Sequence, residues 1–428
     1  MKTLLLTPND FLFFRDSRPM SGALSGHGAH LPAPHVFHNA LHAACHRAFH
    51  GQPEVGYRHG FARKKKIDQH SRKEWISEDS ERFGSLRSVG PFPVDEGGKW
   101  FFPKPADLNH PSNGIAVKPL PDNLPGHSSL LPGLQPLAPL QPPSKDAFPT
   151  WMNKIAFECY LRGEAVSTKD TGFDHDFFLP EHQLGIGMDP QTGTTETGRI
   201  YTREQLRLKE GYRLGTFVES GNRFDAETDL MDRLFPENGY IQVGGENRFC
   251  SVELHSSTPA EALPLGPSLS GTRVKWVLLS PAVFPFIQRD ENSVHPGGWL
   301  PNWIDPGSYK VQLLDGPGSR KAKRTGHNPG QPIRAKLIAA RIERKLPISG
   351  WTNPGSEVSA DRKSGARSTL FAVPAGSVYY FEADIPEQAQ KLAEALNWYG
   401  KTEGKKIVNR RSTLFGEKGF GLGVCASF

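Results

Sequence analysis

A glycine-rich segment at residues 416–423 has the residue types of a loop that can bind a phosphate backbone. Glycines lack a Cβ, so a nucleic-acid strand can approach closely and amide N–H groups can face its phosphates. This segment and the residues just before it supply Arg410, Arg411, Gly416, Lys418, Gly419, Phe420, Gly421 and Gly423. The alternative is an ordinary tight turn. Because the GxxxxGK[ST] pattern is missing, the segment does not indicate nucleotide hydrolysis.

Four histidines follow one face of a helix that is expected to begin near Pro34: His35, His38, His42 and His46. An apolar face lies opposite this stripe and is formed by Phe37, Leu41, Ala44 and Ala48. We therefore expect the histidines to point away from the core, toward solvent or a partner.

Three interpretations of the histidine stripe are open. A solvated or interface stripe is the one we favour. Metal binding would use a pair such as His38 and His42, but the spacing places no third acidic ligand beside them. A catalytic or RNA-contacting histidine is the third. RNA cleavage through 2′-OH attack needs a base, an acid and a cation held together. No segment shows that constellation, so we predict that the chain is not an enzyme.

The charge distribution favours a polyanion partner. The 428 residues carry a formal net charge of +6. Basic residues concentrate in 58–74, 310–345 and 401–418, and the second of these stretches has ten Lys and Arg against two acids. Clusters of this size are typical of nucleic-acid-binding surfaces, although solvated loops would give the same pattern.

The cysteines and the first residues indicate a reducing compartment. Cys45, Cys159, Cys250 and Cys425 are scattered without a CxxC pair, so they predict neither a disulfide framework nor a zinc site. The apolar run in MKTLLLTPNDF is too short for a signal peptide, and no later stretch is long enough to span a bilayer. We therefore expect a cytoplasmic protein without metal or cofactor.

The elements that must position these residues fall into two blocks, and the length favours two domains. In the first domain, 1–270, we expect a strand at Lys2–Leu6, a loop, and the helix from Pro34. An irregular basic and proline-rich insertion follows at about 51–150. Glycines bracket a long hairpin with a polar tip at about 184–203, which could also be an ordinary surface hairpin. The pattern does not identify this domain's second helix.

The second domain, 271–428, ends with a strand, a helix, the glycine-rich loop and a last strand. Strands are expected from Arg273 and around Val378–Glu382. Apolar residues then recur at helical spacing at Ile385, Ala389, Leu392, Leu396 and Tyr399. Gly400 is placed to end that helix. The opening strand completes a β-α-β-β-α-β unit. The expected fold is therefore α+β, with two ferredoxin-like (RRM-like) domains and long insertions.

Several motifs together resemble a known family. A glycine-rich loop before the last strand of a ferredoxin-like domain is the hallmark of RAMP proteins. LTPNDFLFFRDSRPM, LPAPHVFHNALHAA, GIGMDPQTGTTETGRIY, GYIQVGGENRF, LPISGWTNP, PAGSVYYFE and GFGLGV follow one another along nearly the whole chain. In this order they resemble the third Cmr subunit of type III-B CRISPR effector complexes. That subunit is the RAMP-superfamily protein that caps the 5′ end of the guide RNA.

The resemblance implies RNA-binding roles for residues in three motifs. Arg15 and Arg18 match FFRD-x-RP, and their guanidinium groups suit phosphate, while an ion pair with Asp16 is the alternative. The GGE motif adds Gly244, Gly245, Asn247 and Arg248. Its glycines would permit a tight backbone path and its arginine would be available to RNA. The hairpin resembles those with which RAMP subunits separate guide bases, so Ile186 or Met188 would supply an apolar wedge.

The resemblance also implies a function and partners. The chain would be a non-catalytic subunit that binds the repeat-derived 5′ tag of the guide (crRNA). It would bridge the large polymerase-like Cmr subunit to the Cmr backbone RAMP subunit, without cofactor or membrane. A RAMP-type guide-processing endoribonuclease and a structural adaptor that does not touch RNA are the alternatives. The basic run 320–327 and the insertion match no motif, so their partners are unassigned.

Overall fold

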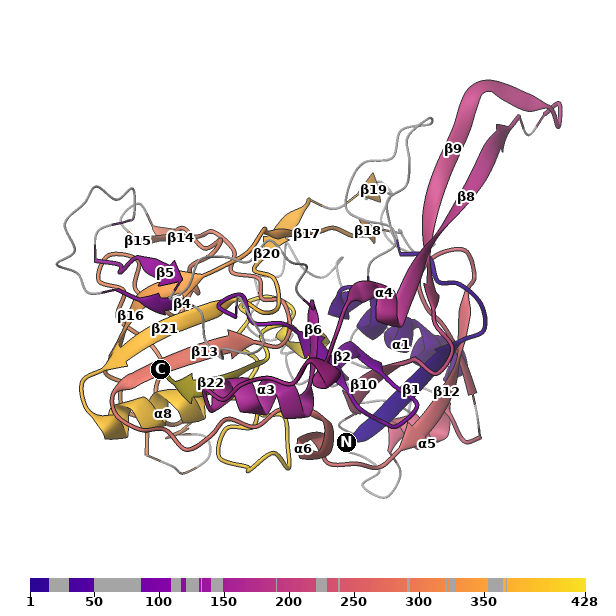
Figure 1. Ribbon diagram of the computed structural model, residues 1–428. Helices are drawn as coiled ribbons and strands as arrows, with labels where there is room; N and C mark the ends of the chain where they lie inside the picture. Colours follow the sequence, from indigo (N-terminus) through magenta and orange to yellow (C-terminus); the bar gives the residue numbers. More distant parts are fainter. Residues whose placement is uncertain are drawn as a thin grey trace. The chain divides into compact units, whose positions relative to one another are not determined.

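The computed structural model resolves the chain into two compact units of mixed strands and helices (Figure 1). It describes residues 1–14, 31–49, 86–108, 117–120, 131, 133–139, 149–189, 191–220, 229–237, 239–290, 293–319, 322–323, 326, 328–352, 365–366 and 368–428. Unit 1 comprises Met1–Glu96, Phe177–Ser257 and Pro347–Leu370. Unit 2 comprises Gly97–Asp176, Thr258–Leu346 and Phe371–Phe428. The fold is α+β, with antiparallel sheets and few helices.

Unit 1 is built on a five-stranded antiparallel sheet with the order β11-β12-β1-β10-β2. Its strands are β1 (Lys2–Pro8), β2 (Arg87–Val94), β10 (Arg213–Glu219), β11 (Gly239–Gln242) and β12 (Phe249–His255). Helix α1 (Pro34–Ala48) packs on β2, β11 and the short α5 (Leu230–Leu234). Leu6 of β1 and Leu41 of α1 are both fully buried, so the core of unit 1 lies between sheet and helices.

The sequence predicted the regular parts of this unit and missed the irregular ones. The expected first strand and the helix from Pro34 are confirmed as β1 and α1. The pattern also did not identify helix α5, because five residues are too few to show a periodicity. Strand β2 lies inside the predicted irregular insertion. Its sequence RSVGPFPV contains a glycine and two prolines, which do not indicate a strand; β2 lies at the edge of the sheet, where proline is tolerated.

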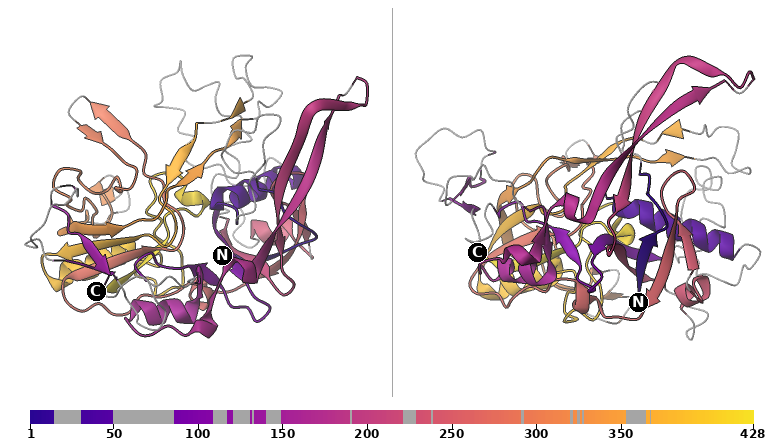
Figure 2. Two further views of the ribbon diagram at one scale, coloured as in Figure 1. Left: turned by 45° about the horizontal axis from the view of Figure 1, so that its top comes forward. Right: turned by 45° about the vertical axis from the view of Figure 1, so that its right-hand side comes forward.

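A long two-stranded ribbon extends from unit 1 well beyond its sheet (Figures 1 and 2). It consists of β8 (Phe178–Met188) and β9 (Thr195–Leu208), which pair in register from Phe178 opposite Leu208 to Ile186 opposite Ile200. The predicted hairpin is thus confirmed and is longer than expected. The remaining strands wholly within unit 1 are β18 (Trp351–Thr352) and β19 (Gly365–Ala366).

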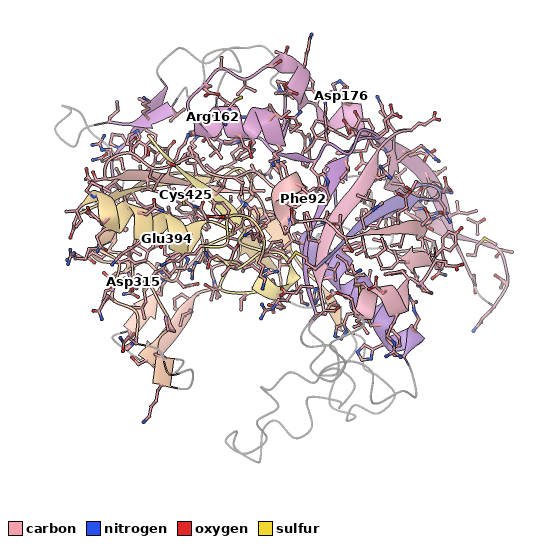
Figure 3. The ribbon with its side chains drawn as sticks, turned by 90° about the horizontal axis from the view of Figure 1, so that it is seen from below. Phe92, Arg162, Asp176, Asp315, Glu394 and Cys425 are labelled. Carbon is pink, nitrogen blue, oxygen red and sulfur yellow. The ribbon has the colours of Figure 1, made fainter. Side chains whose placement is uncertain are left out.

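Unit 2 is built on a four-stranded antiparallel sheet with the order β16-β21-β13-β22. Its strands are β13 (Arg273–Leu278), β16 (Ala335–Arg341), β21 (Val378–Ala383) and β22 (Gly423–Ser427). Helix α8 (Pro386–Leu396) packs on this sheet and buries Leu392 and Leu396 against Trp276 and Phe381. Figure 3 labels Glu394 on this helix and Cys425 on β22. The predicted strand, helix, loop, strand order is confirmed.

A fully buried polar cluster fixes residues 97–176 to unit 2. Lys275 Nζ of β13 lies 3.7 Å from Asp107 Oδ2 and 3.8 Å from the centroid of the Tyr160 ring. The hydroxyls of Tyr160 and Tyr380 donate to Asp107 at 2.6 and 2.8 Å. Because these contacts join the segment to β13 and β21, the observed units differ from the predicted boundary between residues 270 and 271.

The other elements of unit 2 are short. They are β3 (Phe101–Pro103), β4 (Val117–Pro119), β5 (Leu137–Pro139), β6 (Trp151–Asn153), α3 (Lys154–Leu161), η2 (Thr168–Asp170), β7 (Thr171–Gly172), α6 (Pro259–Ala262), β14 (Ile287–Asp290), β15 (Ser293–His295) and η3 (Gly416–Lys418). Helix α4 (Asp174–Phe177) and strands β17 (Leu346–Ile348) and β20 (Leu370–Ala372) lie where the chain passes between units. Residues 279–290 and 293–318 contain no helix, although the β-α-β-β-α-β pattern places one after β13.

Candidate nucleic-acid interface

A cleft of about 410 Å³ opens on unit 1. Three parts of the unit form most of its wall: the segment after β1, the outer face of α1, and the end of β11 with the turn that follows. Its lining includes Phe13, His35, Asn39, Arg47, Gln242 and Gly244. The volume lies within the range of about 300–1,000 Å³ that is typical of ligand pockets. The cleft can therefore accept a group of the size of a nucleotide.

Polar side chains connect the helix to the opposite wall of this cleft. Arg47 Nη1 of α1 donates to Gln242 Oε1 at 2.8 Å, and Gln242 Nε2 donates to Asn247 Oδ1 at 2.9 Å. Arg47 and Asn39 are exposed, whereas Ala40 and Ala43 between them are small and leave the cleft open. Sequence reasoning missed Asn39, Arg47 and Gln242, because nothing in a single sequence shows that α1 faces the end of β11.

The structure corrects the expectation for one of the four histidines on α1. His38 is 5% exposed, and its Nδ1 lies 3.0 Å from Ser88 Oγ on β2. It sits at the margin of the apolar face, where β2 covers it, and β2 was not predicted. His35 lines the cleft. His42 and His46 are half-buried, and the centroids of their rings lie 4.7 Å apart. The stripe is therefore only partly directed to solvent.

The GGE motif forms the turn between β11 and β12. Gly244 has φ +79°, and a Cβ at this position would lie 2.4 Å from the carbonyl oxygen of Phe13. The Gly245 amide donates to that same oxygen at 2.9 Å. Glu246 and Asn247 also have positive φ, at 59° and 53°. The glycines thus permit the tight path that was expected, and the backbone they approach is that of Phe13.

Arg248, at the end of this turn, is held by groups of the protein. Its guanidinium lies over the Phe11 ring, 3.6 Å from the centroid. It also lies 3.6 Å from Asp10 and 3.9 Å from Glu246. A stacked and paired guanidinium of this kind is a structural contact first. RNA would have to displace a carboxylate in order to reach it.

The hairpin presents a stripe of apolar side chains on one face. Leu184, Ile186 and Met188 alternate along β8 and are 66%, 49% and 53% exposed. Ile200 pairs directly with Ile186 and is 57% exposed. On the other face the Tyr201 ring lies against Gly185, where a Cβ would be 2.3 Å from a ring atom. Both residues that were predicted to form a wedge therefore lie on an open apolar face.

The glycines of the C-terminal loop are required by the protein's own packing. Gly421 has φ +77°, and a Cβ there would lie 2.0 Å from the Ser412 amide nitrogen. A Cβ on Gly423 would lie 2.1 Å from Trp276 Nε1. Phe420 is fully buried, with its ring 5.6 Å from that of Phe415. These close approaches occur inside unit 2, so they do not require an RNA backbone.

Four successive amides of this loop donate to carbonyls of the protein. Lys418 and Phe420 donate to Phe415 O at 2.9 and 3.3 Å. Gly419 donates to Gly416 O at 3.2 Å, and Gly421 donates to Pro281 O at 2.7 Å. An amide that already donates cannot also face a phosphate. For residues 418–421, the structure therefore differs from the expectation that amides of this loop face phosphates.

The basic residues beside the loop differ in how closely they are bound to other groups of the protein. Arg411 Nε donates to Ala395 O in the last turn of α8 at 2.6 Å, and burial lowers its pKa to about 10. It therefore caps the helix. Arg410 Nη1 donates to Ile407 O at 3.4 Å. Lys418 Nζ lies 5.5 Å from the centroid of the Phe415 ring. Arg410 and Lys418 are half-buried at the surface of unit 2.

Metal ligands, cysteines and membrane spans can be examined in the described residues, whereas some of the predicted basic residues lie outside them. In the described part of the chain, no group of three His, Cys, Asp or Glu side chains is placed to hold a metal ion. All four cysteines are free, and burial raises the pKa of Cys45 and Cys250 to about 12. None of the described helices is long and apolar enough to cross a membrane. Arg15, Arg18 and most of the basic run 320–327 lie outside the described residues.

Fold and site define a two-unit α+β protein with a surface cleft, an apolar-faced hairpin and an internally bonded glycine-rich loop. A model of the family described as CRISPR-associated protein (Cas_Cmr3) matches residues 4–426. Because the match covers nearly the whole chain, the chain belongs to this family. It is the third-Cmr-subunit family that the motifs resemble.

Solved CRISPR complexes contain chains similar to this one. One is in the cryo-EM structure of the type III-B Cmr-beta bound to cognate target RNA and AMPPnP. It is 14% identical with a TM-score of 0.43, over 95% of this chain and 95% of that chain. Another is in the crystal structure of the Csm3-Csm4 subcomplex of the type III-A interference complex. It is 12% identical with a TM-score of 0.37, over 90% and 93%. No curated protein matches the chain.

Proposed function

We propose that this chain is a non-catalytic RNA-binding subunit of a type III-B (Cmr) CRISPR ribonucleoprotein. In this role it holds the repeat-derived 5′ tag of the guide RNA, and it bridges the large polymerase-like subunit to the backbone RAMP subunits in the cytoplasm. Family membership supports the setting.

The cleft of unit 1 is the observation that carries the proposal. Four segments that resemble the third Cmr subunit line this one cleft, although they are far apart in the sequence. They are the segment with Phe13 and Phe14, the helix with His35 and Arg47, the GGE turn, and the segment with Ser349 and Gly350. Family motifs are expected to converge where the family's ligand binds.

The chemistry of the cleft suits single-stranded RNA. The exposed guanidinium of Arg47 can pair with a phosphate, and the side-chain amides of Asn39 and Gln242 can bond to base edges. The Phe13 ring can stack on a base, which is a sequence-tolerant contact. The apolar stripe of the hairpin would separate neighbouring bases through Ile186 or Met188. In unit 2, Arg410 and Lys418 are the basic side chains through which the C-terminal loop would contact RNA.

We also propose that both units are ferredoxin-like RAMP domains. In unit 1, the first and third strands of the sheet along the chain, β1 and β10, are adjacent inside it, with β2 and β12 outside them. In unit 2, β13 and β21 are adjacent in the same way, between β22 and β16. This order arises when two strand-crossover-strand units interlock in one antiparallel sheet, as in the β-α-β-β-α-β motif.

Arg47→Ala tests the cleft. Fluorescence anisotropy of the full chain with labelled tag RNA should show affinity about three- to tenfold weaker, because one charge-assisted hydrogen bond is lost. The slope of log K against log salt should fall by about 0.7, the value for one phosphate contact on a single strand. Arg162→Ala is the matched control, because this exposed arginine of unit 2 is far from the cleft motifs in sequence and removes the same charge.

Other outcomes separate the competing functions. Wild-type affinity in Arg47→Ala would remove the cleft from the interface. Absence of tag-RNA binding by the unaltered chain would favour the structural adaptor. Metal-independent cleavage of repeat-containing RNA by the purified chain would favour the guide-processing endoribonuclease.

A further inference from the structure

Three arginines lie at the base of the β8–β9 hairpin, two on β9 and one at the end of the GGE turn, and all are paired with carboxylates. Arg207 of β9 binds Asp10 at 2.9 Å and Glu181 of β8 at 3.0 Å. Arg203, also on β9, forms an ion pair with Glu246 of the GGE turn. Arg248 lies beside Asp10 and Glu246. The charges of the cluster balance, so in the free protein these arginines are engaged with acidic groups of unit 1.

These pairs attach the hairpin to the rest of unit 1 at two levels. At the lower level, Leu12 and Leu206 exchange both backbone hydrogen bonds, at 2.7 and 2.8 Å, and Arg207 adds its ion pairs. At the upper level, Arg203 donates to Gln183 across the hairpin at 2.6 Å while it holds Glu246. Arg203 and Arg207 are four residue steps apart along the strand, a rise of about 13 Å.

The hairpin is attached to the rest of unit 1 at two points along its length. Two such points fix the direction in which the hairpin projects, whereas a single point would let it swing. A two-stranded ribbon without a third strand has little intrinsic rigidity. The Arg203 and Glu246 side chains are 20% and 27% exposed, so their pair is less screened than a fully exposed one. Glu246 and Asn247 both have positive φ, and in this conformation of the turn the Glu246 carboxylate pairs with Arg203 of the hairpin.

We propose that the Arg203–Glu246 pair is a strut that sets the direction of the hairpin, so Glu246 and Arg203 are positioning residues and do not contact RNA. The role rests on the proposed function, because a correctly directed hairpin places Ile186 and Met188 at one step of the guide. The GGE motif then has a second task besides lining the cleft: it holds the hairpin that separates the bases.

Pulsed electron–electron double resonance on the full chain tests the strut without RNA. Spin labels are placed at Leu184→Cys on the hairpin and Tyr240→Cys on β11, two side chains that are 66% and 64% exposed. The background is Cys159→Ser, because the other three cysteines are buried and burial raises their pKa. Glu246→Gln should broaden and shift the distance distribution. Glu237→Gln, an exposed glutamate of the same unit, should leave it unchanged.

A charge exchange and an RNA readout complete the test. Arg203→Glu with Glu246→Arg should restore the narrow distribution, which a merely misfolded variant would not do. With a photo-crosslinker at Met188, tag RNA should crosslink mainly at one nucleotide in the parent and at several in Glu246→Gln. The salt slope should stay the same in both.

Two outcomes would overturn the strut. One is an unchanged distance distribution in Glu246→Gln. The other is a salt slope that falls by about 0.7 in Arg203→Ala, which would make this arginine a phosphate ligand. If the parent chain binds no RNA, the proposed function fails, but the distance measurement still decides whether the strut exists.

Discussion

Two clusters of ion pairs, one in each unit, differ in burial and therefore in what they can do. In unit 2, Lys275 and Asp107 are fully buried, and two tyrosine hydroxyls donate hydrogen bonds to the two carboxylate oxygens of Asp107. In unit 1, the pairs of Arg203 and Arg207 are 20–45% exposed at the base of a projecting hairpin. A buried pair tolerates only one packing, because breaking it leaves a charge without solvent. A half-exposed ion pair, by contrast, can set the direction of a projecting element such as the β8–β9 hairpin.

The two glycine motifs show the same contrast. In the C-terminal loop, the space freed by Gly421 and Gly423 is filled by Ser412 and Trp276, and four amides bond internally. In the GGE turn, Gly244 also approaches the protein's own backbone, but the turn borders an open cleft. A glycine motif thus indicates that some other group lies close to the backbone. Whether that group can be a ligand depends on whether the amides of the motif already donate hydrogen bonds within the protein.

The largest expected effect comes from breaking the buried pair. Asp107→Ala should destabilise unit 2 by about 3–5 kcal/mol, because Lys275 would remain buried without a counter-charge. Asp10→Ala in unit 1 should cost less than about 1 kcal/mol, since its partners are half exposed. Urea unfolding of the full chain, followed by tryptophan fluorescence, measures both. Equal losses in the two variants would contradict the comparison.

The C-terminal loop should be sensitive to a single methyl group at one glycine and tolerant at another. Gly421→Ala should cost about 2–3 kcal/mol, because φ is +77° and the Cβ would meet the Ser412 amide nitrogen. Gly416→Ala, whose Cβ would lie 3.4 Å from that of Arg410, should cost less than about 1 kcal/mol. Thermal unfolding compares the two. A stable Gly421→Ala variant with weakened RNA binding would instead return this loop to the RNA interface.

The buried tyrosines of unit 2 should make the chain sensitive to alkali. Burial, together with the Asp107 charge, raises the pKa of Tyr160 and Tyr380, so both stay protonated when folded. In the unfolded chain they ionise near pH 10. Their stabilisation is therefore complete below about pH 10 and is lost above it, by about 1.4 kcal/mol per pH unit for each tyrosine.

Tyr380→Phe isolates one of these groups. It should make the fall in unfolding free energy above pH 10 shallower by that amount, as measured by urea unfolding at several pH values. Tyr240→Phe in unit 1, where the side chain is 64% exposed, is the control and should leave the slope unchanged. A drop in stability that begins well below pH 9 would point to other groups.

The smallest effect on stability is expected at the hairpin. Ile186→Ser with Met188→Ser should change the unfolding free energy by less than about 0.5 kcal/mol, because both side chains are already about half exposed. Binding of tag RNA should nevertheless weaken, and fluorescence of 2-aminopurine at the separated base step should fall. Thr192→Ala with Thr194→Ala at the hairpin tip is the matched control. Undiminished fluorescence would exclude the apolar wedge.

Much of the local structure followed from periodicity. The helices α1 and α8 have apolar residues at helical spacing, and β1, β13 and β21 are short apolar runs between polar or turn-forming residues. The hairpin was bracketed by glycines. These signals are local, because each strand or helix must bury one face whatever lies across from it. Strand β2 and helix α5 had no such signal and were missed.

The candidate site could be predicted only in part. The motifs named Gly244, Gly245, Ile186 and Met188, and all four lie where a ligand could reach them. The sequence could not show that Arg411 caps α8 or that the Gly421 amide bonds to Pro281 O, since each of these contacts joins separate segments of the chain. The sequence also could not show that Arg47 of α1 lies beside Gln242, the last residue of β11.

The sequence by itself determined the family, the principal strands and helices, and the presence of a glycine-rich loop before the last strand, because these depend on residue order and spacing. Only the tertiary structure assigned residues 97–176 to unit 2 and covered His38 with β2. It also paired Glu246 with Arg203. Burial and charge pairing depend on which distant segments meet, and a one-dimensional pattern does not contain that information.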